Sequence, residues 1–525
     1  MAWYIGSTEE TMLPLQLQPE SHVPLYVQLR DQLRSLVHSG ELRPGDRIPA
    51  SRELATQLGV HRTTVANAYA ELESEGLIQG HVGRGTYIRA GSESMKFSPP
   101  PKAAFANGGS VRWESLFAED RSEDGLHRLA QPSPPDSISF VLARPDDRLF
   151  PMQELRSCLD AVLRREGPSI FQLGSTDGYP GLRQELIEFL RGEGLAVREE
   201  NLLITNGCQQ SLDLMAKAFL RAGDAVVLEN PAYPGAITIC AGARTRCLAV
   251  AVRTEWESPG AEGIDVGALE ATLAANRVKL MIVTPDFHNP TGTTLSLESR
   301  RKLLELASRY QVPIVEDHIY ARLHLRGEEM PSLKQLDRTN VVVQIDSFSK
   351  FAFPGLRVGW IVAPANVIER LRWIKQATDL HTGQLAQAAL AEFTRRGLLL
   401  KHLARMRRTY LARLEALEES LERHMPDETR WTRPRGGMCV WLELPAGFDA
   451  SEMLIHARER GVSYAPGRYF YFQEHQPNTL RLGFAGLEEK ETARGVAILA
   501  EILRVEMRKR RGGVRRVEAS RVALV

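Results

Sequence analysis

The sequence predicts a multidomain protein: an N-terminal winged helix-turn-helix followed by a large α/β domain with a mainly parallel sheet. Within residues 21–90, three amphipathic helical patterns precede two short strand-like runs. From about residue 138 onward, apolar runs such as "DAVVLE", "VKLMIVTP" and "NVVVQID" alternate with amphipathic helical patterns. Continuous apolar runs between helices are typical of parallel strands that are covered on both faces.

Composition excludes several classes of protein. The 525 residues are enough for several domains, and a net charge of +1 gives no overall field that would attract nucleic acid or a membrane. The five cysteines are scattered without a CxxC pair, which favours free thiols in a reducing compartment over a disulfide framework or a metal site. There is neither a membrane-length apolar stretch nor a signal-peptide pattern, so we expect a cytoplasmic protein.

Changes in composition predict the domain boundaries. Residues 91–135 are rich in proline, glycine, serine and charge, which is typical of a flexible linker. We therefore expect a DNA-binding domain at 21–90, this linker, a large domain at 136–510 and a basic tail at 511–525. We expect the tail to be a frayed, solvated end.

The N-terminal segment has the element order of a winged helix. Its first helical pattern, "LYVQLRDQLRSLVHS", has one apolar face and is followed by Gly40, which can end a helix. Ser51 is the expected N-cap of the second helix. The third has an inward face of Val65, Ala68, Tyr69 and Leu72. "LIQGHVGRGTYI" then predicts a hairpin, the wing.

The outward side chains of this segment suit DNA. Helix-turn-helix proteins place the start of the recognition helix at base edges and phosphates, and an arginine at the wing tip suits the minor groove. The segment has eight Lys/Arg against seven Asp/Glu, so bulk charge leaves a protein-binding winged helix open as an alternative. The pattern from "PLYVQLRDQL" to "GRGTYI" nevertheless resembles the GntR-type DNA-binding domain nearly end to end. The candidate DNA-binding residues are Ser51, Arg52, His61, Arg62, Thr63, Thr64, Asn67 and Arg84.

A lysine follows one of the predicted buried strands. Lys350 stands in "SFSKFAFPGLRVGW", directly after "VVVQID". A lysine in such a place has to be solvated, paired or chemically used. Burial lowers the pKa of an amine, which makes it a nucleophile toward an aldehyde such as that of pyridoxal phosphate.

A pyridoxal phosphate site has four further requirements, and the sequence contains candidate residues for each of them. The pyridine nitrogen needs an acid, the phenolic oxygen needs donors, the phosphate needs a helix start and hydroxyls, and the ring needs an aromatic cover. Each candidate alone is more often a cap, a turn or a packing residue. In chain order the candidates are Gly207, Cys208, Gln209, Tyr233, Asn289, Asp317, Tyr320, Ser347, Ser349 and Arg357.

The joint order "NGCQQ", "NPAYP", "NPTG", "DHIY", "SFSK", "PGLRVGW" resembles the fold-type I, class I/II aminotransferases over most of residues 138–505. The resemblance implies an α/β fold with a large part at about 170–385 and a smaller α+β part at about 136–169 and 386–510. It also implies Lys350 as internal aldimine, Asp317 at the pyridine nitrogen, Asn289 and Tyr320 at the phenolic oxygen, and Tyr233 stacking on the ring. Arg481 in "TLRLGFAG" would clamp an effector carboxylate; an ordinary ion pair is the alternative.

The sequence departs from that family at one position. Five residues before the glycine of "DGYPGLR" the family often has a tyrosine that reaches the partner subunit's phosphate. Here the position is Leu173, with Phe171 nearby. The phosphate contact is therefore lost or made by another group.

Taken together, the two domains and the linker resemble the MocR family of bacterial transcription regulators. That resemblance implies a head-to-tail homodimer that binds operator DNA and in which an amine or amino acid reacts with the Lys350 aldimine. Two alternatives stay open on the sequence: a working aminotransferase that carries a DNA-binding module, and a regulator that senses pyridoxal phosphate itself.

Overall fold

The computed structural model of the chain describes residues 15, 17–18, 24–43, 45–74, 77–81, 85–88, 137–473 and 475–522, with side chains up to residue 510. It divides into two compact units, within residues 1–118 and 119–525. The expected linker at 91–135 and the wing-tip residue Arg84 lie outside the described residues.

The N-terminal unit is a winged helix-turn-helix with its own core. Its three helices pack with a three-stranded antiparallel sheet in the order β1-β3-β2, in which β1 lies between the first and second helices in the chain and the other two strands follow the third. The inward face predicted for the third helix is confirmed, because all four of its residues are buried. The elements are α1 (Leu25–Ser39), β1 (Arg47–Ile48), α2 (Ser51–Leu58), α3 (Arg62–Ser74), β2 (Ile78–His81) and β3 (Gly85–Ile88).

Two predicted helix ends, one in α1 and one in α2, can be compared directly with the structure. Gly40 ends α1 in the left-handed conformation at φ 81°, as predicted. The prediction for Ser51 is wrong, because α2 already begins at Ser51 and Ala50 is its N-cap. Alanine has no side-chain acceptor, so the carboxylate of Glu53 reaches back to the Ala50 N–H at 3.0 Å instead.

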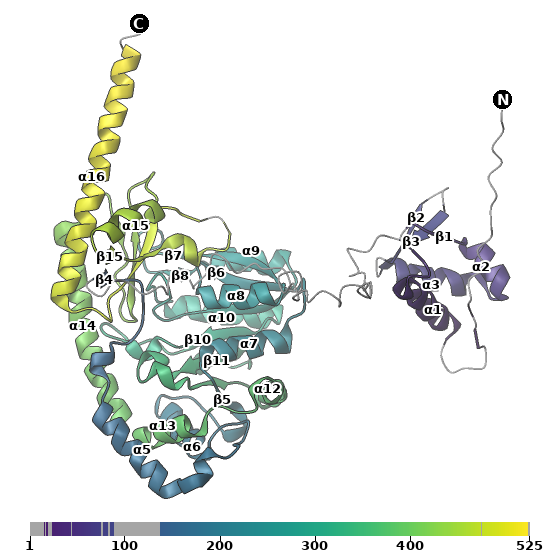
Figure 1. The fold of residues 1–525 in the computed structure, drawn as a ribbon, viewed down its shortest axis with the longest axis horizontal. Coiled ribbons are helices and arrows are strands. Elements are labelled where there is room, and N and C mark those ends of the chain that lie inside the picture. Colours follow the sequence, from purple (N-terminus) through teal and green to yellow (C-terminus); the bar gives the residue numbers. More distant parts are fainter. Residues whose placement is uncertain are drawn as a thin grey trace, which may run out of the picture. The chain divides into compact units, whose positions relative to one another are not determined.

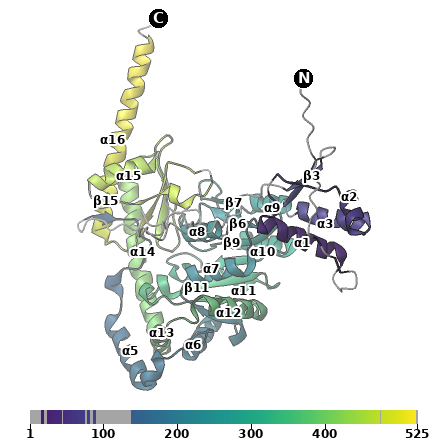
Figure 2. The same ribbon diagram turned by 45° about the vertical axis from the view of Figure 1, so that its right-hand side comes forward.

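The second unit is built on an eight-stranded sheet in the order β5-β12-β11-β10-β9-β6-β7-β8 (Figures 1 and 2). The neighbours from β11 through β10, β9 and β6 to β7 are parallel, whereas β12 is antiparallel to both of its neighbours. The strands are β5 (Leu202–Thr205), β6 (Ala225–Asn230), β7 (Arg246–Arg253), β8 (Gly263–Ile264), β9 (Val278–Val283), β10 (Ile314–Asp317), β11 (Val342–Ser347) and β12 (Gly359–Val362).

Helices cover both faces of this sheet, as the continuous apolar runs predict. One face forms a core with α7, α8 and α12, and the other forms a core with α9, α10 and α11. Local signals set where these helices begin: Ser296 caps α10 by accepting from Ser299 N at 3.2 Å, and Pro234 opens α8. The helices are α7 (Cys208–Phe219), α8 (Pro234–Gly242), α9 (Val266–Ala275), α10 (Leu297–Tyr310), α11 (Leu333–Leu336) and α12 (Ala365–Asp379).

A smaller α+β part is formed by the end of the chain together with residues just after 136. Its four-stranded antiparallel sheet has the order β13-β14-β17-β16, and β4 (Ile138–Ser139) pairs with β15. The long helices α14 and α16 lie side by side (Figure 1). The elements are β13 (Arg430–Trp431), β14 (Cys439–Glu443), β15 (Val462–Ser463), β16 (Ala465–Pro466), β17 (Thr479–Gly483), α14 (Leu398–His424), α15 (Ala450–Glu459) and α16 (Glu489–Val522).

Three helices complete this unit: α5 (Met152–Glu166), α6 (Pro180–Gly192) and α13 (Gln384–Arg395). Helix α13 packs against both α5 and α6. The basic tail differs from expectation, because α16 continues as a helix through Val522 instead of ending in a frayed segment. In the described part of the chain, no helix combines the length and apolar character that a membrane crossing requires.

Candidate cofactor and effector site

The predicted site residues follow the carboxyl ends of neighbouring strands. Asp317 ends β10, Lys350 follows β11, and Asn289 follows β9. Tyr233 follows β6, and Gly207 separates β5 from α7. Parallel strands bring their carboxyl ends to one edge of a sheet, which is where open α/β sheets bind ligands.

Lys350 is held at this edge by a backbone carbonyl. Its Nζ donates a hydrogen bond to the carbonyl oxygen of Ala143 at 2.8 Å and lies 5.3 Å from the centroid of the Tyr320 ring. Burial, together with the positive charge of Arg481, lowers the pKa of Lys350 to about 8, although the charge of Asp317 opposes both effects. The amine is therefore much more nucleophilic at neutral pH than an ordinary lysine.

Asp317 responds to burial in the opposite direction. Its side chain accepts a hydrogen bond from the Ile319 N–H at 3.2 Å, yet burial raises the pKa of Asp317 to about 7. A carboxyl in this state is suited to a partner that brings a positive charge, as a protonated pyridine nitrogen does.

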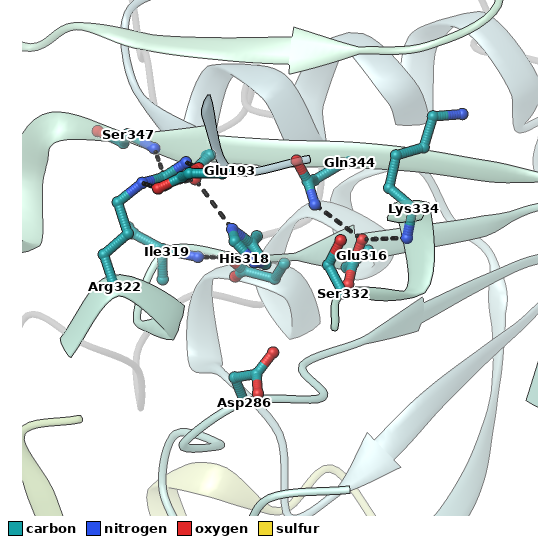
Figure 3. Close-up of polar contacts among 12 residues, drawn as sticks. Glu193, Asp286, Glu316, His318, Ile319, Arg322, Ser332, Lys334, Gln344 and Ser347 are labelled. Atoms are coloured by element: carbon teal, nitrogen blue, oxygen red, sulfur yellow. Dashed lines mark hydrogen bonds and ion pairs between the residues drawn. The ribbon is translucent and has the colours of Figure 1, made fainter. Parts of the chain in front are cut away.

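A network behind Asp317 fixes the ends of β10 and β11. The guanidinium of Arg322 forms an ion pair with the carboxylate of Glu193 (Figure 3). It also forms one with the carboxylate of Asp346. Asp346 also accepts from Ser347 N at 2.6 Å and lies 3.1 Å from His318 Nδ1. Although burial opposes it, this contact with Asp346 raises the pKa of His318. A cavity of about 790 Å³ lies behind the network, lined by Glu193, His318 and Arg322 but not by Lys350.

The predicted phosphate cup is assembled around the start of α7. Gly207 precedes the helix at φ +89°, and a Cβ there would lie only 2.8 Å from Nη2 of Arg357. Arg357 Nη1 lies 3.4 Å from Ser349 Oγ, which in turn lies 2.8 Å from Ser347 Oγ. A helix N-terminus, a guanidinium and two hydroxyls gathered around a glycine are suited to a phosphate.

Cys208 and Gln209 open α7, as predicted, but only one of them shows a polar side-chain role. Cys208 is buried, and burial raises the pKa of its thiol. The Gln209 side chain accepts a hydrogen bond from the Tyr233 hydroxyl at 3.1 Å, which fixes the tyrosine at the start of α8. Burial raises the pKa of Tyr233 to about 12, so it stays a neutral ring.

Arg481 is the second buried cation of the site. From β17, Nη1 donates to Asn289 Oδ1 and Nη2 donates to the carbonyl oxygen of Val141, both at 2.6 Å. Its guanidinium carbon lies 4.8 Å from the centroid of the Phe470 ring. Nε is buried and has no hydrogen-bond partner. Among the described residues, the structure brings Arg481 to Asn289 and to no carboxylate, which does not support the alternative of an ordinary ion pair.

Sequence reasoning missed the segment that holds both cations. The Val141 and Ala143 carbonyls accept from Arg481 and Lys350 respectively. We call residues 140–143 the strap. Every residue has a backbone carbonyl, so these contacts cannot be predicted from residue types. The nearest clue is that the apolar run "SISFVLA" follows the predicted linker.

The residues present fit pyridoxal phosphate. A half-buried amine, a buried carboxyl, an anion cup and an aromatic ring are the groups that the cofactor's aldehyde, ring nitrogen, phosphate and ring face require. The orphan Nε of Arg481 shows that the site has donor capacity left for a ligand. In the described residues, no three His, Cys, Asp or Glu side chains are grouped as metal ligands.

In the N-terminal unit the structure exposes most of the candidate DNA-binding residues. Arg52, His61, Arg62, Thr63 and Asn67 are exposed, and His61 Nδ1 lies 2.8 Å from Thr63 Oγ1. Ser51 and Thr64 are partly buried.

Two sequence families match the chain. Residues 25–88 match the bacterial regulatory proteins of the gntR family, and residues 147–499 match aminotransferase class I and II. The HTH-type transcriptional regulator TauR of Rhodobacter capsulatus is 32% identical over 93% of this chain and 98% of its own length. The probable rhizopine catabolism regulatory protein MocR of Rhizobium meliloti is 29% identical over 92% of this chain and 94% of its own.

Among solved structures, the α-aminoadipate aminotransferase LysN from Thermus thermophilus is similar to the second unit. Its TM-score is 0.67 at 35% identity, over 75% of this chain and 98% of that one. That structure holds N-(5'-phosphopyridoxyl)-L-leucine. The aminotransferase fold and the pyridoxal phosphate cofactor expected from the sequence are thereby confirmed.

The lowered pKa of Lys350 can be tested in protein from which the cofactor has been removed. At pH 7 an amine with a pKa near 8 is about one-tenth neutral, against well under a thousandth for an ordinary lysine. The rate of pyridoxal phosphate attachment, followed by absorbance, should rise with pH and level off above about pH 8. Arg481→Gln removes a positive neighbour and should move this profile to higher pH. A rate that keeps rising toward pH 10 in the unmodified protein would contradict the assignment.

Proposed function

Since the chain belongs to the MocR-type regulators, which join a GntR-type DNA-binding domain to a class I and II aminotransferase domain, we propose that an amine or amino acid reacting at Lys350 sets its affinity for operator DNA. The observation that carries this proposal is the strap: the two cations that such an effector would engage are both held by carbonyls of one short segment. As a DNA-binding regulator it would work in the cytoplasm.

The bound pyridoxal phosphate supplies an aldehyde that exchanges amines reversibly and withdraws electrons into its ring. The residues of the chain then have separate tasks. Asp317 would hold a proton on the ring nitrogen, Asn289 and Tyr320 would contact the phenolic oxygen, and Tyr233 would cover the ring. An effector amine would take the place of the Lys350 amine at the aldehyde carbon.

Arg481 would bind the effector's carboxylate. Its two Nη atoms already point to oxygen acceptors, and a carboxylate offers two such acceptors in the matching bidentate geometry. Amino acids are favoured over simple amines for this reason. The leucine adduct in the related LysN structure supports the same class of ligand.

Ligand binding would then compete with the strap. A carboxylate on Arg481 would replace Val141 O, whereas the Lys350 amine that the effector displaces from the cofactor would again be free to donate to Ala143 O. Ligand binding would therefore change which carbonyl of residues 140–143 is held, and these residues follow in the chain after the segment that leads from the DNA-binding unit. A ligand that binds one arrangement more tightly shifts the balance between the two, and DNA affinity changes with it if the two arrangements differ in DNA affinity.

A second candidate function is transamination. It is favoured by the complete set of Lys350, Asp317 and Arg481 at one sheet edge, which half a transamination also requires. Turnover of an amino donor with a keto acid distinguishes an enzyme from a receptor. A regulator that senses the cofactor alone would change its DNA affinity on loading with pyridoxal phosphate and show no further response to amino acids.

The effector proposal predicts the behaviour of Lys350→Ala. The variant should lose the visible absorbance of the covalently held cofactor and should no longer change operator affinity when amino acids are added. The measurement is a fluorescence-anisotropy titration of operator DNA with and without each common amino acid. A variant that still responds would rule out chemistry at Lys350 as the trigger; steady-state turnover by the unmodified protein, without any change in DNA affinity, would favour the enzyme.

The DNA interface proposed for α2 and α3 has its own test. Arg62→Ala removes an exposed guanidinium at the start of α3 and should weaken binding to a DNA fragment selected by the full chain by roughly 1–3 kcal/mol. Glu73→Ala, exposed near the other end of the same helix, is the matched control and should not weaken binding. Equal affinities of Arg62→Ala and the unmodified protein would place the interface elsewhere.

The proposed homodimer is supported by an exposed apolar patch of Phe171, Leu173 and Leu380, which are 69%, 79% and 52% exposed. The loop that carries Leu173 lies against Gln384, four residues after Leu380, because a Cβ on Gly174 would meet the side chain of Gln384. A soluble monomer seldom leaves such a patch open. A second copy of the chain is the occupant that we propose.

Sedimentation velocity tests this interface. Leu173→Glu should lower the dimer fraction at micromolar concentration, because it places a charge in an apolar contact. Ile455→Glu on α15, where the isoleucine is 60% exposed, is the matched control and should leave the dimer intact. Dissociation by neither substitution would show that the patch is not the interface.

A further inference from the structure

Two of the five cysteines meet where α8 passes into β7. Cys240 lies in α8 and is fully buried, and Cys247 lies in β7 and is partly buried. Cys247 packs against the apolar cluster that contains Cys240, and a side-chain hydrogen bond links the two thiols. Neither residue is used by the cofactor or effector site described above.

Thr245 holds the turn between the two cysteines. Its hydroxyl donates to the carbonyl oxygen of Cys240 at 2.9 Å and lies 3.8 Å from Cys247 Sγ. The Thr245 N–H also donates to the Cys240 carbonyl, at 3.1 Å. Thr245 therefore joins the backbone of Cys240 to the side chain of Cys247 and holds the turn between the two residues.

The two thiols differ in the way that thiol–disulfide chemistry requires. The hydrogen bond from Cys240 and the hydroxyl of Thr245 lower the pKa of Cys247, although burial opposes them. Cys247 is also the more exposed of the two, whereas the same hydrogen bond and burial raise the pKa of Cys240. Burial raises the pKa of Cys158, Cys208 and Cys439 as well, and all three are buried. Cys247 is therefore the expected nucleophile.

We propose that Cys240 and Cys247 form a reversible intramolecular disulfide when the protein meets a hydroperoxide. The Cys247 thiolate attacks the peroxide oxygen, the O–O bond breaks, and the sulfur becomes a sulfenic acid while hydroxide leaves and takes up a proton. The Cys240 thiol then attacks that sulfur, loses its proton and displaces the sulfenic oxygen as water. Two thiols and one hydrogen peroxide thus give one disulfide and two waters.

The position of the pair connects it to elements near the cofactor site. Helix α8 begins at Pro234, directly after Tyr233. The Cys247 carbonyl accepts from Gln473 Nε2 at 3.3 Å, and Phe470, three residues earlier, accepts from Ala232 N through its own carbonyl at 2.7 Å. A disulfide between Cys240 and Cys247 would join the end of α8 to β7. These elements connect to Tyr233, which is proposed to cover the cofactor ring, and to the loop that carries Phe470.

The positions of the arginines make the test direct. Trypsin cuts after Arg221, Arg244, Arg246 and Arg253, so Cys240 and Cys247 fall on separate peptides, 222–244 and 247–253. The full chain loaded with cofactor is treated with hydrogen peroxide, alkylated, digested without reduction and analysed by mass spectrometry. We expect one linked species that contains both peptides, two hydrogens lighter than their sum, in a chain that still migrates as a monomer on a denaturing gel without reductant. Dithiothreitol should restore both thiols.

The other three cysteines and two substitutions serve as controls. Cys158, Cys208 and Cys439 should stay fully alkylated in the denatured sample. Cys240→Ser should leave Cys247 as a sulfenic acid that dimedone traps, and Cys247→Ser should leave Cys240 unoxidised. If both peptides stay singly alkylated after peroxide, or if the link joins two chains, the proposal is overturned.

Discussion

The candidate site depends on two cations at one edge of a parallel sheet: Arg481, which is buried, and Lys350, which is half-buried. Each donates to a carbonyl of the same short segment, at 2.8 Å for Lys350 and 2.6 Å for Arg481. A buried ammonium or guanidinium without an acceptor is very unfavourable. A carbonyl oxygen supplies an acceptor without a full negative charge, so neither cation is neutralised, and Nε of Arg481 still lacks a partner among the described residues. An anionic ligand is therefore still attractive to Arg481, which a carboxylate partner from the chain would have prevented.

The same burial acts in opposite directions on the two titrating groups of the site. It lowers the pKa of Lys350 to about 8 and raises the pKa of Asp317 to about 7, so both approach neutral pH from opposite sides. The amine then becomes available as a nucleophile, and the carboxyl is ready to ionise when a positive ring nitrogen arrives. The Arg322–Asp346–His318 network supports this arrangement, because it fixes the ends of β10 and β11 from which Asp317 and Lys350 project.

The sequence was informative wherever chemistry depends on the residue type. Lys350 and Asp317 can be predicted from the sequence because each stands at the end of an apolar run, where a charged side chain has to be solvated, paired or chemically used. The order of the strands in the sheet then brings the two residues to the same edge. Gly40 was found because only a left-handed cap requires glycine there. The strap was missed because its contacts use backbone carbonyls, which every residue has. The prediction of Ser51 as N-cap is wrong although serine is a preferred N-cap residue, because the helix begins one residue earlier and the Glu53 carboxylate accepts from the Ala50 N–H.

The N-terminal segment has almost equal numbers of basic and acidic residues, and this limits how strongly it can bind DNA on its own. With eight basic and seven acidic residues, residues 21–90 gain little non-specific attraction to phosphates, so affinity has to come from a few well-placed contacts and from binding at two sites. Two-site binding is sensitive to the reach and orientation of the connection between the modules. On the proposed function, a change at the strap would act on residues 140–143, which follow that connection in the chain. A small rearrangement around Lys350 and Arg481 would then alter operator affinity without touching any of the residues proposed to contact DNA.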